Sequence, residues 1–108
     1  MSYKVAAIEH FRKEAKRLIR KYPSLKAEIA GLGEELSNDP KLGTPLGSGY
    51  YKIRLSIASK GKGKSGGARV ITYVFVAETT VFLLSIYDKS ERSSISSAEL
   101  EELLRQIE

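Results

Sequence analysis

The first third of the chain carries apolar residues at helical spacing. From Glu9 to Tyr22 they recur every three or four positions, with basic residues on the other faces. Pro23 disfavours helical backbone in the residue before it, so we predict a helix that ends at Tyr22. Ser24 can cap a second helix, whose apolar positions are Leu25, Ile29, Leu32 and Leu36. The short turn between the two helices predicts an antiparallel helical hairpin.

After Gly49 the apolar period changes to two. Residues 38–49 are rich in glycine and proline without a period, which predicts a connecting loop. From residue 51 to 57 apolar and polar residues alternate, as in a strand with one buried face. The same alternation places Lys52 and Arg54 together on the opposite face.

The remaining pattern completes an α+β fold. Residues 3–8 alternate weakly, residues 69–77 and 81–87 have strand composition, and residues 81–87 are apolar enough for the centre of a sheet. Ser96 and Glu99 have the spacing of a capping box, which predicts a final helix. We therefore expect one domain over residues 1–108, in which an N-terminal strand and helical hairpin pack on a three- to four-stranded antiparallel sheet with a C-terminal helix.

Composition narrows the chemistry. The chain has no cysteine, which excludes disulfides, thiolate catalysis and cysteine-ligated zinc. No apolar run is long enough to span a bilayer, and the N-terminus does not have the pattern of a cleaved targeting segment, so we expect a cytoplasmic protein without a membrane partner. The formal net charge of +5 makes an acidic partner plausible.

The positive charge is concentrated in residues 52–70. This stretch contains no carboxylate and six cationic residues, which are Lys52, Arg54, Lys60, Lys62, Lys64 and Arg69. A cluster of cations without acids repels itself unless a ligand neutralises it, which favours a phosphate-binding surface. A solvated hairpin tip at residues 58–67, whose lysines only aid solubility, is the alternative.

Residues 58–65 also fit the loose pattern of a nucleotide-binding phosphate loop. That loop requires a helix after it, whose N-terminus binds the phosphates. The residues from Arg69 to Val76 are β-branched and aromatic, which predicts a strand. We therefore do not interpret this stretch as a nucleotide-hydrolysing site.

Three motifs follow one another along the chain: Tyr-Lys-Ile-Arg-Leu at 51–55, Gly-Lys-Ser-Gly-Gly-Ala-Arg-Val-Ile at 63–71 and Leu-Leu-Ser-Ile-Tyr-Asp-Lys-Ser-Glu at 83–91. In this order they resemble the RelE/ParE superfamily of toxin–antitoxin toxins, and most closely its HigB-like branch. The resemblance implies a ribosome-dependent messenger-RNA endonuclease that inhibits translation. Such toxins bind the ribosomal A site and cleave by attack of the ribose 2′-hydroxyl on the adjacent phosphate, without metal or small-molecule cofactor. It also implies a cognate antitoxin that masks the basic face.

The resemblance implies roles for individual residues. Arg69 would hold the scissile phosphate, for which a planar bidentate cation is suited. Lys52 and Arg54 match a Lys-x-Lys pair associated with backbone contact and charge stabilisation, and Tyr87 and Lys89 close the site. The resemblance assigns RNA or ribosome binding to three lysines of the hairpin tip, Lys60, Lys62 and Lys64. Which residue is the general base stays open, because arginine at position 54 replaces a potential base.

Two other functions remain open at this point. ParE-like members of the superfamily act on DNA gyrase, and fold alone does not separate them from nucleases. An inactive nucleic-acid or partner-binding module is the other. His10 is the single histidine, lies at the start of a helix, and is expected to be a surface or packing residue, so a two-histidine nuclease mechanism is excluded.

Overall fold

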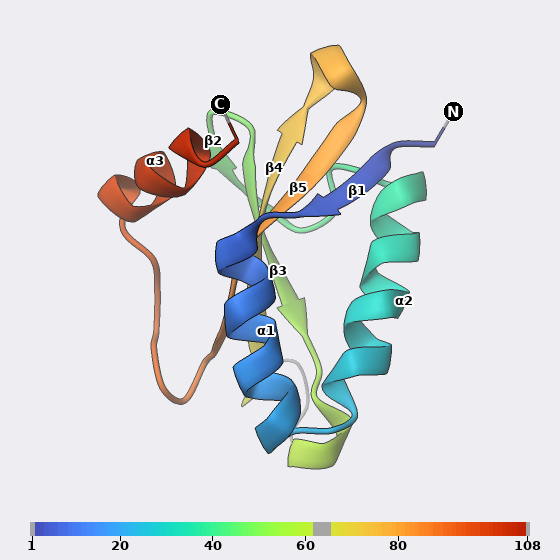
Figure 1. Ribbon diagram of the computed structural model, residues 1–108, viewed down its shortest axis with the longest axis vertical. Coiled ribbons are helices and arrows are strands. Elements are labelled where there is room, and N and C mark those ends of the chain that lie inside the picture. The colour runs from blue at the N-terminus through green and yellow to red at the C-terminus, as the bar shows by residue number, and fades with distance from the viewer. Residues whose placement is uncertain (1, 62–65, 108) are drawn as a thin grey trace.

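The computed structural model describes residues 2–61 and 66–107 and has the predicted α+β architecture (Figure 1). Its elements are β1 (Lys4–Ala7), α1 (Glu9–Lys21), α2 (Leu25–Asn38), β2 (Thr44–Gly47), β3 (Tyr50–Leu55), β4 (Ala68–Phe75), β5 (Thr80–Asp88) and α3 (Ser97–Arg105). Short 3-10 turns lie at Ala58–Lys60 and Val76–Glu78. Among the described residues, none of the helices is both long and apolar enough to cross a membrane.

The strands form one sheet in the order β1-β5-β4-β3-β2. The expectation was a three- to four-stranded antiparallel sheet, and the sheet has five strands. It is also mixed, since β1 pairs with β5 in parallel while the other pairs are antiparallel. The strand at the centre is β4, and β5 lies beside it. The parallel partner covers only the first half of β5, from Thr80 to Leu83.

The segment predicted as a plain loop contains strand β2, so that prediction was wrong in part. All four residues of β2 are exposed at the sheet edge, and the strand includes Pro45. An exposed edge strand needs no buried alternation, and proline is tolerated there, so the sequence gives no strand signal. Two of the glycines that suggested a loop belong to the turn from β2 into β3, where Gly47, Ser48 and Gly49 have φ of 92°, 54° and 89°.

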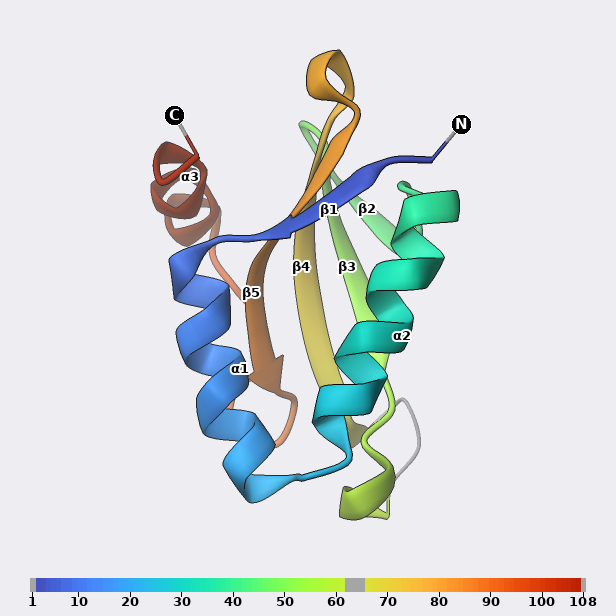
Figure 2. The same cartoon turned by 45° about the vertical axis from the view of Figure 1, so that its right-hand side comes forward.

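The helical hairpin covers one face of the sheet (Figure 2). Helix α1 buries Phe11, Ala15 and Leu18, and α2 buries three leucines of the predicted stripe. Helix α1 ends at Lys21 with Tyr22 as its C-cap residue, one residue before the predicted end. The predicted side-chain cap of α2 was wrong, because the Ser24 hydroxyl makes no capping bond and lies 2.8 Å from the Ser59 hydroxyl.

Helix α3 begins with the predicted capping box. The Glu99 backbone N–H donates to Ser96 Oγ at 3.2 Å, and the Ser96 N–H donates to Glu99 Oε1 at 3.3 Å. Leu100 and Leu103 are buried. Figures 1 and 2 both show α3 beside the sheet, on the side where α1 begins and away from α2.

Candidate functional site

Three predicted site residues form one row across the sheet. Arg54 of β3 is the register partner of Arg69 of β4, and Arg69 is in turn the partner of Tyr87 of β5. Side chains directly opposite one another in antiparallel strands lie on the same face, with Cβ atoms about 5 Å apart. We call Arg54, Arg69 and Tyr87 the cross-strand row.

Lys52 extends this row along β3. It lies two residues before Arg54 and pairs with Ile71, which lies two residues after Arg69. Residues two apart on a strand share a face and are about 7 Å apart. Lys52 therefore lies on the same face of the sheet as the cross-strand row.

The row is buried at its centre and open at one end. Arg69 and Tyr87 are each 4% exposed, whereas Arg54 is exposed and Lys52 is half-buried. The Arg69 guanidinium donates to the Ala68 carbonyl oxygen at 3.2 Å. The charge of Arg69 is therefore largely shielded from water, in surroundings where electrostatic interactions are stronger, whereas Arg54 and Lys52 are accessible from solvent.

Gly67 brings Lys89 to the same end of the sheet. A Cβ atom on Gly67 would lie 2.2 Å from the Leu55 carbonyl oxygen, so this close approach of β3 and the start of β4 requires glycine. On its other side, the Gly67 carbonyl oxygen accepts a hydrogen bond of 3.1 Å from the Lys89 backbone N–H. Lys89 is half-buried, directly after β5. The glycine-rich motif thus joins the backbone of Lys89 to the segment that leads into Arg69.

Tyr87 has an unusual environment for a buried tyrosine. Its hydroxyl is buried and makes no hydrogen bond within the described residues. Burial raises the pKa of the Tyr87 hydroxyl, and the opposing charges of Arg69 and Arg92 do not offset that effect. The phenol is therefore a neutral proton donor over the physiological pH range.

Arg92 and Glu99 belong to this environment, and the sequence reasoning missed both. The Arg92 guanidinium lies 5.5 Å from the centre of the Tyr87 ring and is paired with Glu99 of α3. That pairing is the main cause that lowers the pKa of Glu99. Arg92 follows Tyr87 in an irregular segment without a period, so no sequence pattern pointed to it.

Lys60, one of the lysines predicted to bind RNA or the ribosome, is already held by a carboxylate. Its Nζ atom lies 2.5 Å from Oδ1 of Asp88 and 3.0 Å from the Ser90 hydroxyl, and its side chain is only 10% exposed. A cation held in a buried ion pair is not free for a solvent-borne phosphate. Lys62 and Lys64 lie outside the described residues.

The residues after the glycine-rich segment form strand β4, as predicted. This confirms the reason for rejecting a nucleotide-binding phosphate loop, which needs a helix in that place. Among residues 2–61 and 66–107, no three histidine, cysteine, aspartate or glutamate side chains gather in a way that could hold a metal ion.

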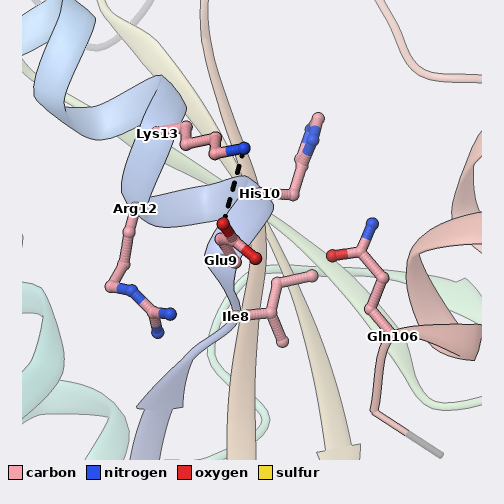
Figure 3. Close-up of a pocket in the computed structure, with 6 residues that line it drawn as sticks. All are labelled: Ile8, Glu9, His10, Arg12, Lys13 and Gln106. Carbon is pink, nitrogen blue, oxygen red and sulfur yellow. Dashed lines mark ion pairs between the residues drawn. The ribbon is translucent and has the colours of Figure 1, made fainter.

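A separate concavity of about 590 Å³ lies where α1 begins, near the end of α3 (Figure 3). Most of its charged side chains are paired, because Lys13 contacts Glu9 at 3.4 Å and His10 contacts Glu14 at 3.0 Å, while Arg12 donates a hydrogen bond to the Ala7 carbonyl oxygen. Glu14 in turn accepts a hydrogen bond from the Ser85 hydroxyl at 2.8 Å. His10 is thus part of a structural network, as expected, and the cross-strand row is the stronger candidate site.

Comparison with known proteins identifies the family. A family model described as the RelE toxin of the RelE/RelB toxin–antitoxin system matches residues 4–107. A free-state mutant of Escherichia coli toxin RelE superimposes with a TM-score of 0.65 at 19% identity, covering 100% of both chains. The RelBE2 toxin–antitoxin complex of Mycobacterium tuberculosis gives a TM-score of 0.63 at 22% identity, covering 82% of this chain and 99% of that one.

A third structure, an E. coli RelE mutant in complex with an antitoxin RelB peptide, gives a TM-score of 0.54 at 22% identity and covers 94% of each chain. At such identities the solved structures show the fold, while the family model spans nearly the whole sequence. The protein therefore belongs to the RelE toxin family of the RelE/RelB toxin–antitoxin system.

Proposed function

We propose that this toxin is a ribosome-dependent messenger-RNA endonuclease that inhibits translation. The observation that carries the proposal is the cross-strand row, with two arginines and a neutral, buried tyrosine on one face of the sheet. Cleavage by a ribose 2′-hydroxyl requires a base that takes the 2′-hydroxyl proton, stabilisation of negative charge on the phosphate, and protonation of the leaving 5′-oxygen. The row offers the last two of these functions, and it assigns no residue as the base.

Each arginine has a distinct role in this mechanism. Arg69 holds the scissile phosphate, because its guanidinium is planar, permanently charged and nearly excluded from water. Arg54 and Lys52 are more accessible and guide the RNA backbone to that position. Lys89 adds positive charge at the end of the row next to Gly67.

Tyr87 is the proposed general acid. Its raised pKa keeps the proton on the phenol, and its hydroxyl makes no hydrogen bond within the described residues. A buried hydroxyl without a hydrogen-bond partner destabilises the free protein. That cost is recovered when a ligand oxygen accepts a hydrogen bond from the hydroxyl. The leaving oxygen of RNA is such an acceptor.

We also propose a cognate antitoxin as the protein partner. Two of the similar structures are a RelBE2 toxin–antitoxin complex and a RelE mutant bound to an antitoxin peptide. This chain has the same fold and matches the RelE toxin family model, which supports an antitoxin partner for it as well.

The test is to add the purified protein to a reconstituted translation reaction and to map new messenger 5′ ends by primer extension. Cleavage that requires ribosomes is expected, and the same RNA without ribosomes is the control. A reaction with gyrase and relaxed plasmid runs in parallel. Inhibited supercoiling with intact messenger would contradict the proposal and favour the ParE-like function.

Variants connect the activity to the row. Arg69→Ala should slow cleavage about 100- to 1000-fold, as expected when a donor to a developing anion is lost. Lys13→Ala is the matched control, since it removes one cation that is 76% exposed on the helical side of the molecule. Equal activity of Arg69→Ala and the control would refute the assignment of Arg69. RNA binding without cleavage by the unmodified protein would instead indicate an inactive module.

A further inference from the structure

Four aromatic side chains form a continuous cluster at the end of the sheet next to the β4–β5 turn. The ring centres of Tyr50 and Tyr73 are 5.4 Å apart, and those of Tyr73 and Phe75 are 6.2 Å apart. The ring centres of Phe75 and Phe82 are 6.5 Å apart. Tyr50 is 7% exposed, whereas the other three are half-buried and so reach solvent. We call these four residues the aromatic cluster.

The aromatic cluster lies on the same face of the sheet as the cross-strand row. On β3, Tyr50 lies four residues before Arg54, and strand alternation keeps such residues on one face. On β4, Tyr73 lies four residues after Arg69, and it is the register partner of Tyr50. The cluster is therefore about 13 Å from the row along the strands.

The α1–α2 hairpin covers the other face of the sheet (Figure 2). Asp88 accepts a hydrogen bond of 2.8 Å from the hydroxyl of Tyr22, the residue that follows α1. Strand alternation turns the preceding residue, Tyr87, away from that helix. The face that carries the row and the aromatic cluster is thus the one that the hairpin leaves uncovered.

A bulge in β5 brings Phe82 into the cluster. Phe82 and Tyr87 are five residues apart, so unbroken alternation would turn them toward opposite faces. The register of β4 against β5 shifts by one residue between Ile71 and Thr72, so that Tyr73 pairs with Phe82. Bulges of this kind re-aim side chains and are common next to functional sites. Here the shift places the Phe82 ring on the face of the cross-strand row.

Two lysines lie on this face on either side of the cluster. Lys52 follows Tyr50 by two residues on β3. Lys4 of β1 lies two residues before Ala6, which is the register partner of Phe82. Within the described residues, neither lysine makes an ion pair. The surface thus combines aromatic rings with positive charge that no carboxylate neutralises.

We propose that the aromatic cluster binds bases of a single-stranded RNA whose backbone continues past the cross-strand row. Bases stack on aromatic rings with little dependence on sequence, and cations beside the rings hold the phosphates. A sheet that carries aromatic residues on neighbouring strands can stack two or three bases in this way. The identity of the nucleic acid rests on the proposed function. The inference adds a base-binding subsite to a row that has phosphate and proton-transfer chemistry.

A protein partner fits this surface less well. Tyrosine and phenylalanine are common in protein interfaces, but lysine is depleted there. Lys4 is exposed and Lys52 is half-buried, and both would lose hydration against a protein that offered no carboxylates. A nucleic acid supplies the rings with bases and the lysines with phosphates from one ligand.

Phe75 has the smallest structural role in the cluster. Tyr73 and Phe82 pack against the hydrophobic core, whereas Phe75 does not. Phe75 contacts the rings of these two residues and is otherwise half-buried. Replacing Phe75 therefore tests ligand binding with little effect on the fold.

The test measures binding of a fluorescein-labelled single-stranded RNA of about 12 nucleotides to the full chain by fluorescence anisotropy, without ribosomes. A second labelled oligomer of the same length carries stable abasic units, which keep every phosphate and remove the bases. The RNA should bind at least about 10-fold more tightly than the abasic oligomer, because stacked bases add binding free energy. That ratio should persist at high salt, where phosphate contacts weaken.

Substitutions then connect base binding to the cluster. Phe75→Leu keeps an apolar side chain and removes the ring, so it should weaken RNA binding about 10-fold and leave binding of the abasic oligomer unchanged. Tyr51→Leu is the matched control, because Tyr51 is a half-buried aromatic residue of β3 on the face opposite to Tyr50, and it should change neither affinity. Circular dichroism checks that each variant is folded. The comparison of the two oligomers with the unmodified protein needs no substitution.

Three results would overturn the proposal. They are equal affinity for the RNA and the abasic oligomer, equal weakening of RNA binding by Phe75→Leu and Tyr51→Leu, and no RNA binding by the unmodified protein. The assay contains no ribosomes and measures no cleavage, so its failure is separate from that of the proposed function. Base-dependent binding without cleavage would contradict only the proposed function, and cleavage with binding through phosphates alone would contradict only this inference.

Discussion

Tyr87 and Asp88 are neighbours at the end of β5, yet their surroundings are opposite. Tyr87 lies on the face with Arg54 and Arg69, and its buried hydroxyl has no hydrogen-bond partner among the described residues. Asp88 is fully buried and accepts hydrogen bonds from three residues, which are Lys60, Ser90 and Tyr22. Strand alternation thus turns two adjacent polar side chains toward opposite faces, Tyr87 toward the face of the proposed site and Asp88 toward a cluster of hydrogen bonds.

The hydrogen bonds of Asp88 explain why its carboxylate stays charged inside the protein. Burial by itself would raise its pKa, but hydrogen bonds from Lys60, from the backbone and side chain of Ser90, and from Tyr22 together hold the pKa well below the ordinary value of 3.8. The Asp88 cluster ties the end of β5 to α1 and to the turn at Ala58–Lys60. A polar group with all its partners in place is thus structural here, and one without partners is the candidate for function.

The largest expected effect on stability is that of Asp88→Ala. This change leaves the Lys60 ammonium, 10% exposed, without its carboxylate, and such losses cost about 3–5 kcal/mol. Urea unfolding monitored by circular dichroism measures the change in the free energy of unfolding. The double variant Asp88→Ala with Lys60→Met should recover part of that loss, because no unpaired charge remains buried. A single variant as stable as the parent would show that the cluster is not structural.

Tyr87→Phe should give the opposite result. Removing a buried hydroxyl that has no partner should change the free energy of unfolding by no more than about 0.5 kcal/mol, or stabilise the protein. In the translation reaction described above, however, the variant should cleave messenger about 100-fold more slowly, because the proton donor is absent. Destabilisation comparable to that of Asp88→Ala would contradict the distinction between the two residues.

Sequence patterns predicted the elements and the faces better than the contacts between elements. Alternation along β3 placed Lys52 and Arg54 on one face, but the pairing of Arg54 with Arg69 depends on the register of β3 against β4, which local periodicity does not determine. Lys60 looked like a free cation because its partner, Asp88, is 28 residues away along the chain. Side-chain pairing of this kind is a property of the folded state.

Acid pH should lower the free energy of unfolding through Asp88, whereas Tyr87 does not titrate in that range. The pKa of Asp88 is lower in the folded protein than in the unfolded chain, so its contribution to stability is complete above about pH 5 and is lost as pH falls through the folded-state pKa. Asp88→Asn lacks this titration. Urea unfolding at pH 6, 4 and 3 should therefore show a steeper loss for the parent than for Asp88→Asn. Parallel pH profiles would show that Asp88 is not responsible for the acid sensitivity.

Among the charge changes in this region, the smallest expected effect comes from Glu91, at the solvent side of the same cluster. Glu91 contacts Arg17 at 2.8 Å and Lys21 at 3.2 Å, but its side chain is 36% exposed, so water and salt screen both ion pairs. Glu91→Gln should lower the free energy of unfolding by less than about 1 kcal/mol, and the difference should shrink at high salt. Urea unfolding at low and high salt measures it, with Glu102→Gln, in the exposed pair of Glu102 with Arg105, as the matched control. A loss as large as that of Asp88→Ala would mean that Glu91, and not the burial of Asp88, holds the end of β5 against α1.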